Sequence, residues 1–331
     1  MNRTVNEITF SIILETENIE TSDIDRLQKS IVLLAAQSPE QANEVVLIDS
    51  GNTPRQVLNQ LQLRYPWLTI KSAPPETEYY ESKMLGLEWT TGEIIVYYDS
   101  DCIYEGEWLA TLVGSFDNVN IQVVCGETTT DGIGLYGTAI ALCYVFPQYS
   151  GRSDLFPVNQ YFLNNVAFRR SVLEAIPIPT NLPLYRGNCV IHAQTLLAAG
   201  YTIWRQPKAR SLHAPPNGLG HYFKRFLLIG HDLYWQKQLV GGSPLAPLGK
   251  GGIREELIDD SDEFSDDPTI TEQRSNLAIG LDRIRKMIQR DRRHAFYLPF
   301  CLPIVLVSVL LIAIGYQITC RHPHQLRDRL T

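Results

Sequence analysis

The sequence predicts a doubly wound, mainly parallel α/β sheet followed by a membrane-anchoring helix. Short apolar runs alternate with helical patterns through the N-terminal third of the chain, which is typical of parallel strands joined by helices. Two of these runs lead directly into aspartates. Near the C-terminus, 26 consecutive residues from Ala295 to Cys320 carry no formal charge.

The strands are predicted from apolar runs at residues 8–14, 44–48, 68–71 and 93–98. Ser22 opens the first helix, whose apolar side carries Leu27, Ile31 and Leu34. Pro54 is placed at the first position of the second helix. A third helix is expected over residues 76–90, ending at Gly92.

Composition excludes several classes of protein. With 331 residues, of which 44% are hydrophobic, the chain can bury a large core and is not disordered throughout. Its six cysteines stand apart without a C-x-x-C pair, which argues against a disulfide framework or a zinc site and favours a reducing compartment. The net charge is −7, and eight carboxylates fall within residues 255–267. No nucleic-acid partner is implied.

Residues 296–318 form an apolar stretch longer than the ~20 residues that cross a bilayer as a helix. A buried core helix is the alternative interpretation. Pro299 and Pro303 lie in the first two turns, which leaves a re-entrant segment open. We favour one membrane span, preceded by a basic amphipathic helix on anionic lipid.

Basic residues predict the orientation of this span. Six precede it within a short segment and three follow it, so the positive-inside rule places the long N-terminal part in the cytoplasm. No apolar run follows Met1, and we therefore expect no secretory signal. The expected localisation is a single-pass membrane protein whose N-terminal domain lies on the cytoplasmic side.

The aspartates after the second and fourth strands are the leading site candidates. Ligands of open α/β sheets bind beyond the carboxyl ends of the strands, where Asp49, Asp99 and Asp101 are predicted to lie. Paired carboxylates suit Mg²⁺ or Mn²⁺ and a nucleotide diphosphate. The competing interpretation of Asp99-Ser100-Asp101 is a capping turn before the helix that contains Trp108.

Several segments together resemble the family-two glycosyltransferases, inverting enzymes of the GT-A fold. The resemblance covers roughly residues 7–235. It is carried by ITFSIIL, VVLIDSGN and SKMLGLEWTTGEIIVYYDSDC, then by Trp108-Leu109, by NNVAFRRSVLEAI (164–176), and by GYTI and ARSLH between residues 200 and 213. The resemblance implies a nucleotide-diphosphate sugar donor and a divalent cation. The membrane anchor and the interfacial helix favour a lipid-linked or glycan acceptor at the membrane.

The resemblance also implies roles for individual residues at the positions that match the family's motifs. It implies that Asp49 reads the base, Lys83 holds the nucleotide, Asp99 contacts ribose or metal, and Asp101 ligates metal. His213 is the expected extra ligand; a backbone-bonded histidine is its alternative. Lys83 is equally consistent with a solvated helix position. The remaining donor-side candidates are Glu17, which stands where the family has Pro-x-Tyr-Asn, and Arg225, which would steady the leaving diphosphate or lie on an interfacial helix.

The sequence departs from the family pattern at the catalytic base. Gly187-Asn188-Cys189 stands where a Glu-Asp pair is usual. Because inverting transfer needs a proton acceptor, His192 and Glu127, the latter expected after a strand at residues 122–125, are the replacement candidates. The alternative for His192 is a polar position on a mainly apolar helix, and Arg186 is a candidate for binding acceptor or phosphate.

The predicted organisation has five parts. Residues 1–238 form the glycosyltransferase domain, 239–271 a flexible acidic linker, 272–294 the amphipathic helix, 295–319 the transmembrane helix and 320–331 a short basic tail. The predicted function is metal-dependent sugar transfer for cell-envelope glycan or glycolipid synthesis. The alternative is an inactive nucleotide-sugar-binding scaffold, and a nucleotidyltransferase is disfavoured because no Gly-rich phosphate loop follows the first strand.

Overall fold

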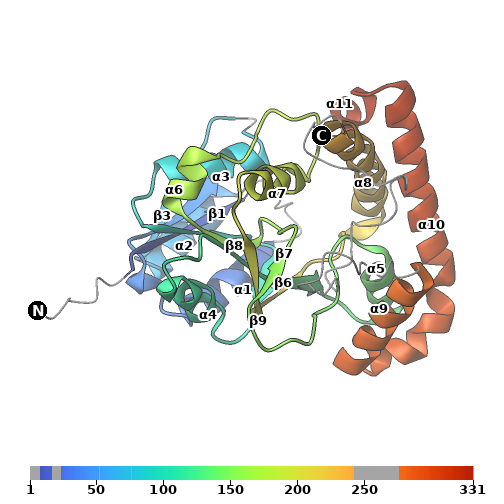
Figure 1. The fold of residues 1–331 in the computed structure, drawn as a ribbon, viewed down its shortest axis with the longest axis horizontal. Coiled ribbons are helices and arrows are strands. Elements are labelled where there is room, and N and C mark those ends of the chain that lie inside the picture. Colours follow the sequence, from blue (N-terminus) through green and yellow to red (C-terminus); the bar gives the residue numbers. More distant parts are fainter. Residues whose placement is uncertain (1–7, 17–23, 52, 76, 242–275, 331) are drawn as a thin grey trace, which may run out of the picture. The chain divides into compact units, whose positions relative to one another are not determined.

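The fold is described from a computed structural model of residues 8–16, 24–51, 53–75, 77–241 and 276–330 (Figure 1). Its contacts divide the chain into two compact units. Unit 1 comprises Met1–Glu127, Ser153–Thr180 and His192–Ser211, and unit 2 comprises Thr128–Arg152, Asn181–Ile191 and Leu212–Thr331. Each unit is described by itself.

Unit 1 contains the predicted α/β sheet. Its strands are β1 (Phe10–Glu15), β2 (Glu44–Asp49), β3 (Leu68–Ser72), β4 (Ile94–Tyr98), β5 (Cys102–Tyr104), β7 (Phe156–Val158) and β8 (Asn165–Arg169), together with most of β6 (Val123–Thr130) and β9 (Ile203–His213). The sheet order is β3-β2-β1-β4-β8-β6-β9-β5, with β7 paired to β9. The first four strands are mutually parallel, whereas β8 is antiparallel to β4 and β6.

Helices cover both faces of this sheet, as a doubly wound fold requires. They are α1 (Ile24–Ala35), α2 (Arg55–Arg64), α3 (Tyr79–Glu88), α4 (Trp108–Gly114), α6 (Arg170–Ala175) and the larger part of α7 (Asn188–Ala198), with 3₁₀ turns η2 (Pro39–Gln41) and η3 (Ser115–Asp117). α1 and α4 pack with Ile12 and Leu14 in the main core. α3 covers the other face, where Gly86 leaves room for Ile13 and Ile48.

The predicted elements match the observed ones with small shifts. α1 ends at Ala35 rather than at Pro39, which instead begins η2, and Pro54 caps α2 instead of starting it. The proposed opening residue Ser22 lies outside the described residues. β6 is longer than expected and runs to Thr130, so Glu127 lies within the strand and not after it.

Unit 2 is helical and contains the apolar C-terminal stretch. Its helices are α5 (Gly134–Cys143), α8 (Gly218–Gly241), α9 (Asn276–Arg290), α10 (Arg293–Arg321) and α11 (Gln325–Leu330). α10 is long and apolar enough to cross a membrane by length and composition, and it contains Pro299 and Pro303 in its N-terminal part. The predicted flexible linker lies almost entirely outside the described residues.

Two glycines bring α8 and α10 into close contact. A Cβ added at Gly230 would lie 2.1 Å from the Ile312 carbonyl oxygen, and one at Gly315 would lie 2.0 Å from the Leu227 carbonyl oxygen. Real Cβ atoms do not tolerate such distances, so side chains larger than hydrogen would push the two helices apart.

Replacing Gly230 by alanine is therefore expected to destabilise unit 2 by about 1–3 kcal/mol through overpacking. Gly280→Ala is the matched control, because a Cβ at Gly280 on α9 meets nothing within 4 Å, and there the better helix propensity of alanine is expected to be neutral or stabilising. Thermal unfolding of the detergent-solubilised full chain checks both variants. Equal melting temperatures for the two would contradict the close packing.

Candidate active site

The parallel strands bring the predicted aspartates to one edge of the sheet. In the order β2-β1-β4, Leu14 lies beside Leu47 and Ile13 beside Tyr97, so the carboxyl ends of all three strands face the same way. Asp49 ends β2 and is buried at 7% exposure. Its carboxylate accepts a hydrogen bond from the Thr16 hydroxyl at 3.1 Å, which fixes the aspartate beside the chain that leaves β1.

Asp99 is held by a dense set of contacts. The Lys83 ammonium donates to its carboxylate at 2.7 Å and to the Tyr98 carbonyl oxygen at 2.7 Å. The Tyr79 hydroxyl donates to the same carboxylate at 2.9 Å. The backbone N–H of Asp99 donates to the Tyr104 hydroxyl at 2.8 Å. Asp99 is only 4% exposed, and its carboxylate is positioned by its own neighbours.

Lys83 is completely buried, which excludes the solvated helix position among the sequence interpretations. Its ammonium contacts the Asp99 carboxylate and the Tyr98 carbonyl oxygen, and it lies 5.4 and 5.8 Å from the ring centroids of Tyr79 and Tyr97. Asp99 is the site candidate that it contacts. Tyr79 was missed by sequence reasoning. It lies four residues before Lys83 on α3, one helical turn away on the same face, and that spacing was the available signal. Tyr104 gave no comparable signal.

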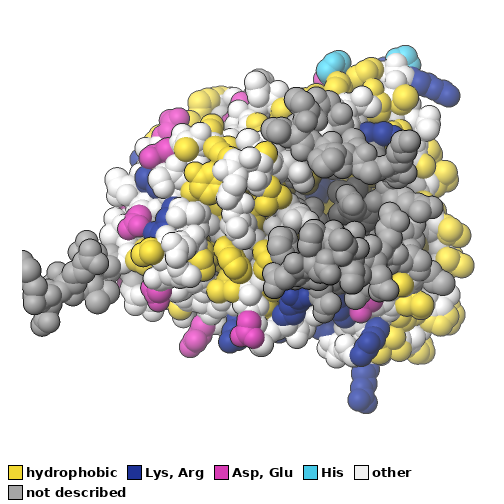
Figure 2. All heavy atoms as spheres, in the orientation of Figure 1, with side chains coloured by type: hydrophobic (Ala, Val, Ile, Leu, Met, Phe, Trp, Pro, Cys, Tyr) yellow, Lys and Arg dark blue, Asp and Glu magenta, His cyan; other side chains and the backbone are white. Residues whose placement is uncertain are grey.

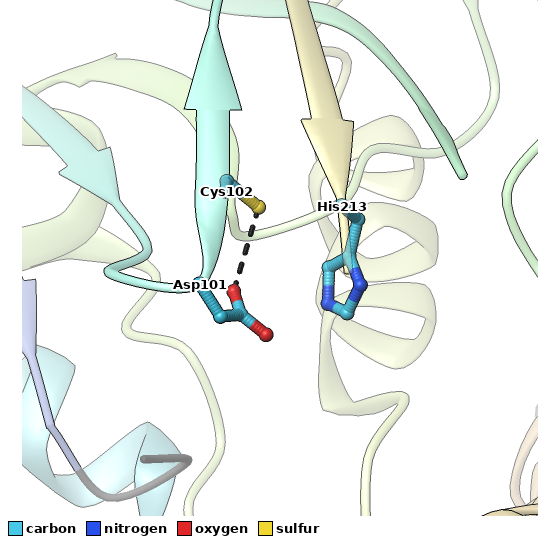
Figure 3. Close-up of side chains that lie close together, drawn as sticks. All are labelled: Asp101, Cys102 and His213. Atoms are coloured by element: carbon cyan, nitrogen blue, oxygen red, sulfur yellow. Dashed lines mark hydrogen bonds between the residues drawn. The ribbon is translucent and has the colours of Figure 1, made fainter. Parts of the chain in front are cut away.

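Asp101 is less constrained than Asp99. It is half-buried, its carbonyl oxygen accepts a hydrogen bond from Arg26, and its carboxylate accepts one from the Cys102 thiol at 3.5 Å (Figure 3). Burial raises the pKa of the Cys102 thiol well above its ordinary value. Cys102 therefore stays protonated as a donor, and a hard divalent cation would take oxygen or imidazole ligands in preference to it.

His213 is the last residue of β9. Within unit 2 its Nδ1 lies 2.6 Å from the Ala214 carbonyl oxygen, and its ring lies against Phe146 with centroids 4.5 Å apart. The contact at Nδ1 fixes the ring orientation, an arrangement typical of metal-binding histidines as well as of structural ones.

The candidate bases occupy different surroundings. His192 is completely buried on α7, with Nδ1 2.5 Å from the Tyr161 hydroxyl and Nε2 2.8 Å from the Ile176 carbonyl oxygen. Both ring nitrogens thus have core partners, which argues against the expected role as a base for an acceptor hydroxyl. Glu127 is 5% exposed, and its carboxylate lies 3.9 Å from the Arg210 guanidinium.

Burial also lowers the pKa of His192 from 6.5 to about 4. The unfolded chain therefore takes up a proton first as the pH falls, and His192 costs stability between about pH 6.5 and 4. We expect the melting-temperature advantage of wild type over His192→Leu to shrink across this window. The rate of transfer per folded molecule should be unchanged in His192→Leu; its complete loss would instead support His192 as the base.

Asn165 organises the strands around the site. Its side-chain amide donates to the Ala209 carbonyl oxygen at 3.0 Å and to the Glu127 carbonyl oxygen at 3.2 Å, and its oxygen accepts from the Trp108 indole at 2.8 Å. One side chain on β8 therefore ties β6, β9 and α4 together. The segment that resembled the acceptor side of the family thus includes a structural anchor.

Arg225 lies in unit 2, on α8. Its guanidinium donates to the Tyr144 hydroxyl at 2.8 Å. It is one of three cations near the Tyr185 ring, with Arg186, Arg225 and Lys224 at 4.5, 5.4 and 5.9 Å from the ring centroid. Asp232 accepts hydrogen bonds from the backbone N–H groups of Tyr185 and Arg186 at 2.7 and 2.9 Å, and burial raises its pKa to about 7.

Glu17, the remaining donor-side candidate from the sequence, lies outside the described residues.

Comparison with known proteins places this arrangement in a family. Residues 13–176 match Glycosyl transferase family 2, and they contain the sheet edge with Asp49, Asp99 and Asp101. The chain carries a family 2 glycosyltransferase domain. A glycosyltransferase, AglE of Haloferax volcanii, is 23% identical over 216 residues, which are 63% of this chain and 69% of that protein.

Two solved structures share the fold. A mannosyltransferase of Pyrobaculum calidifontis, solved with GDP-Man and Mn²⁺, has a TM-score of 0.53 at 15% identity, covering 97% of this chain and 84% of its own. GalNAc-T7, solved with UDP, GalNAc and Mn²⁺, has a TM-score of 0.51 at 13% identity over 70% of this chain, which spans about half (52%) of that protein. The family 2 domain is a GT-A glycosyltransferase fold, so the fold class and enzyme class predicted from the sequence are confirmed.

Proposed function

We propose that this glycosyltransferase transfers a sugar from a nucleotide-diphosphate donor to a lipid-linked or glycan acceptor at the membrane, with a divalent cation bound by Asp101 and His213. The observation that carries the proposal is the Asp101 carboxylate in the turn after β4, next to the tightly held Asp99. Two of its structural neighbours were solved with nucleotide or nucleotide sugar and Mn²⁺.

Strand pairing supports the inclusion of His213. In unit 1, the Glu105 N–H donates to the Arg210 carbonyl oxygen at 3.0 Å, and Figure 3 shows β5 and β9 running in opposite directions. β9 continues from Arg210 for three more residues along the same strand and ends at His213. Carboxylate oxygen and imidazole nitrogen are donors that Mn²⁺ accepts, and Mg²⁺ favours the oxygen.

Each candidate side chain is proposed to have its own role in the transfer. Asp49 and Asp99 are proposed to contact the nucleoside, with Lys83 and Tyr79 holding the Asp99 carboxylate in place. A bound cation would neutralise the charge that develops on the leaving diphosphate. Arg225, in the cation cluster around Tyr185, is proposed to add positive charge at the same phosphates. Glu127 is the base candidate whose chemistry suits removal of the acceptor proton during inversion.

Attachment to the membrane is proposed to occur through α10, with the catalytic domain in the cytoplasm. The support is the apolar composition of α10 and the excess of basic residues before it. This arrangement favours an acceptor that is itself held in the bilayer.

The full chain in isolated membranes, incubated with a panel of labelled nucleotide sugars and a lipid extract, tests the proposal. We expect label to enter the lipid fraction with one donor, to stop on chelation and to return with Mn²⁺ or Mg²⁺. Glu127→Gln should abolish transfer while leaving donor binding intact. Metal-dependent donor binding without turnover of any donor would instead favour a nucleotide-sugar-binding scaffold.

A further inference from the structure

α10 presents a continuous apolar face to its surroundings. Its most exposed large side chains are 55% to 71% accessible (Phe296, Phe300, Leu302, Leu306, Val309 and Leu310). Figure 2 shows hydrophobic side chains over α10, with basic side chains near both of its ends. An apolar surface of this extent on a soluble protein marks a site for lipid or for another protein.

The opposite face of α10 packs along its whole length within unit 2. At the N-terminal end, His294 Nδ1 lies 2.8 Å from the Thr138 hydroxyl on α5. Further along, Ser308 contacts the Tyr222 hydroxyl at 2.8 Å, and Thr319 contacts His231 at 3.1 Å, both on α8. These pairs advance together along both helices, so α8 and α10 run side by side in the same direction.

This packing is incompatible with a simple crossing of the bilayer. A crossing α10 would take α8 into the hydrocarbon with it, together with Lys224, Arg225 and Asp232, and buried charges there are costly. If α8 and α10 both crossed in the same direction, α8 would end on the far side of the bilayer. The chain would then have to cross back before α9, which lies at the start of α10. That connection carries the eight carboxylates of residues 255–267.

The charges at the two ends of α10 also argue against a crossing. Arg292 and Arg293 are exposed before the apolar face, and Arg321 and Arg329 are exposed after it. Asp291 and Asp328 only partly offset them. A basic excess at both ends keeps both ends at the cytoplasmic surface, where anionic headgroups complement them.

We propose that unit 2 docks on a single anionic leaflet with α10 lying in the plane of the membrane, its exposed apolar face in the acyl region and both ends on the cytoplasmic side. The single crossing favoured by the sequence is replaced by one-leaflet attachment. This deepens the membrane attachment proposed above and does not depend on which sugar is transferred. In-plane helices of this kind bind through buried apolar area and basic flanks.

The test determines the side on which the C-terminal tail lies, using the full chain in a bacterial inner membrane. Arg329→Cys and Leu63→Cys are each made in a Cys320→Ser background; Leu63 is 84% exposed in unit 1 and reports the side of the catalytic domain. A membrane-impermeant maleimide is applied to spheroplasts and to inside-out vesicles. The Cys320→Ser parent gives the background labelling.

We expect both cysteine variants to react in inside-out vesicles and both to lose the reaction in spheroplasts. Labelling of Arg329→Cys in spheroplasts, with Leu63→Cys reactive only in inside-out vesicles, would overturn the proposal in favour of a crossing helix. Recovery of the chain in the soluble fraction would also overturn it. Neither readout uses transferase activity, so failure of the proposed sugar transfer would be seen separately.

Discussion

Asp101→Asn is expected to lower the rate of sugar transfer at least about a hundredfold, the usual cost of losing one electrostatic contact to a transition state. Asparagine keeps the size of the side chain and an acceptor for the Cys102 thiol, which lies 3.5 Å from the carboxylate, but it removes the charge that would hold the cation. The fold should therefore survive. Transfer to the lipid fraction at saturating Mn²⁺ measures the effect.

Asp117→Asn is the matched control, because Asp117 is exposed on η3 and its substitution should leave transfer unchanged. Melting temperatures of both variants close to wild type would show that loss of transfer is not loss of structure. Wild-type rates in Asp101→Asn would remove Asp101 from the metal site and with it the central part of the proposed function.

Lys83→Met is expected to have the largest effect on stability, about 3–5 kcal/mol of unfolding free energy, because it leaves one partner of a buried ion pair without compensation. The Lys83 ammonium is fully buried and lies 2.7 Å from the Asp99 carboxylate. Methionine fills most of the space of the lysine stem, so the loss reports the charge more than a cavity. Thermal unfolding of the solubilised full chain measures it.

Lys29→Met makes the same change at an exposed position on α1 and should cost little. Combining Lys83→Met with Asp99→Asn should recover part of the stability, because the neutral amide does not need a cation, while transfer stays low. A double variant as unstable as the sum of the two single variants would show that the pair is not energetically coupled.

Much of unit 1 was predictable from local sequence patterns. The four parallel strands and the helices between them were expected within a few residues of their observed ends, because apolar runs and helical periodicity are properties of short segments. The placement of Asp49 and Asp99 at strand ends followed from the same patterns. β6 was misjudged because GETTT, residues 126–130, lacks an apolar run, although its backbone is paired in the sheet.

The roles of individual polar side chains were harder to predict from the sequence. Lys83 and His192 are alike in sequence to the extent that each is a polar residue on a predicted helix. The structure separates them: Lys83 contacts Asp99 at the site, whereas both nitrogens of His192 meet Tyr161 and Ile176. Such partners come from segments distant in the chain, and no local pattern encodes them.

The sequence by itself determined the alternating sheet, the acidic strand ends and the apolar stretch near the C-terminus, because each depends on neighbouring residues and on composition. Only the tertiary structure decided how Asp99 is held and which face of α10 is covered. Those features depend on the close approach of distant segments, such as Gly315 on α10 to the backbone of Leu227 on α8, and burial and contact exist only once the chain has folded.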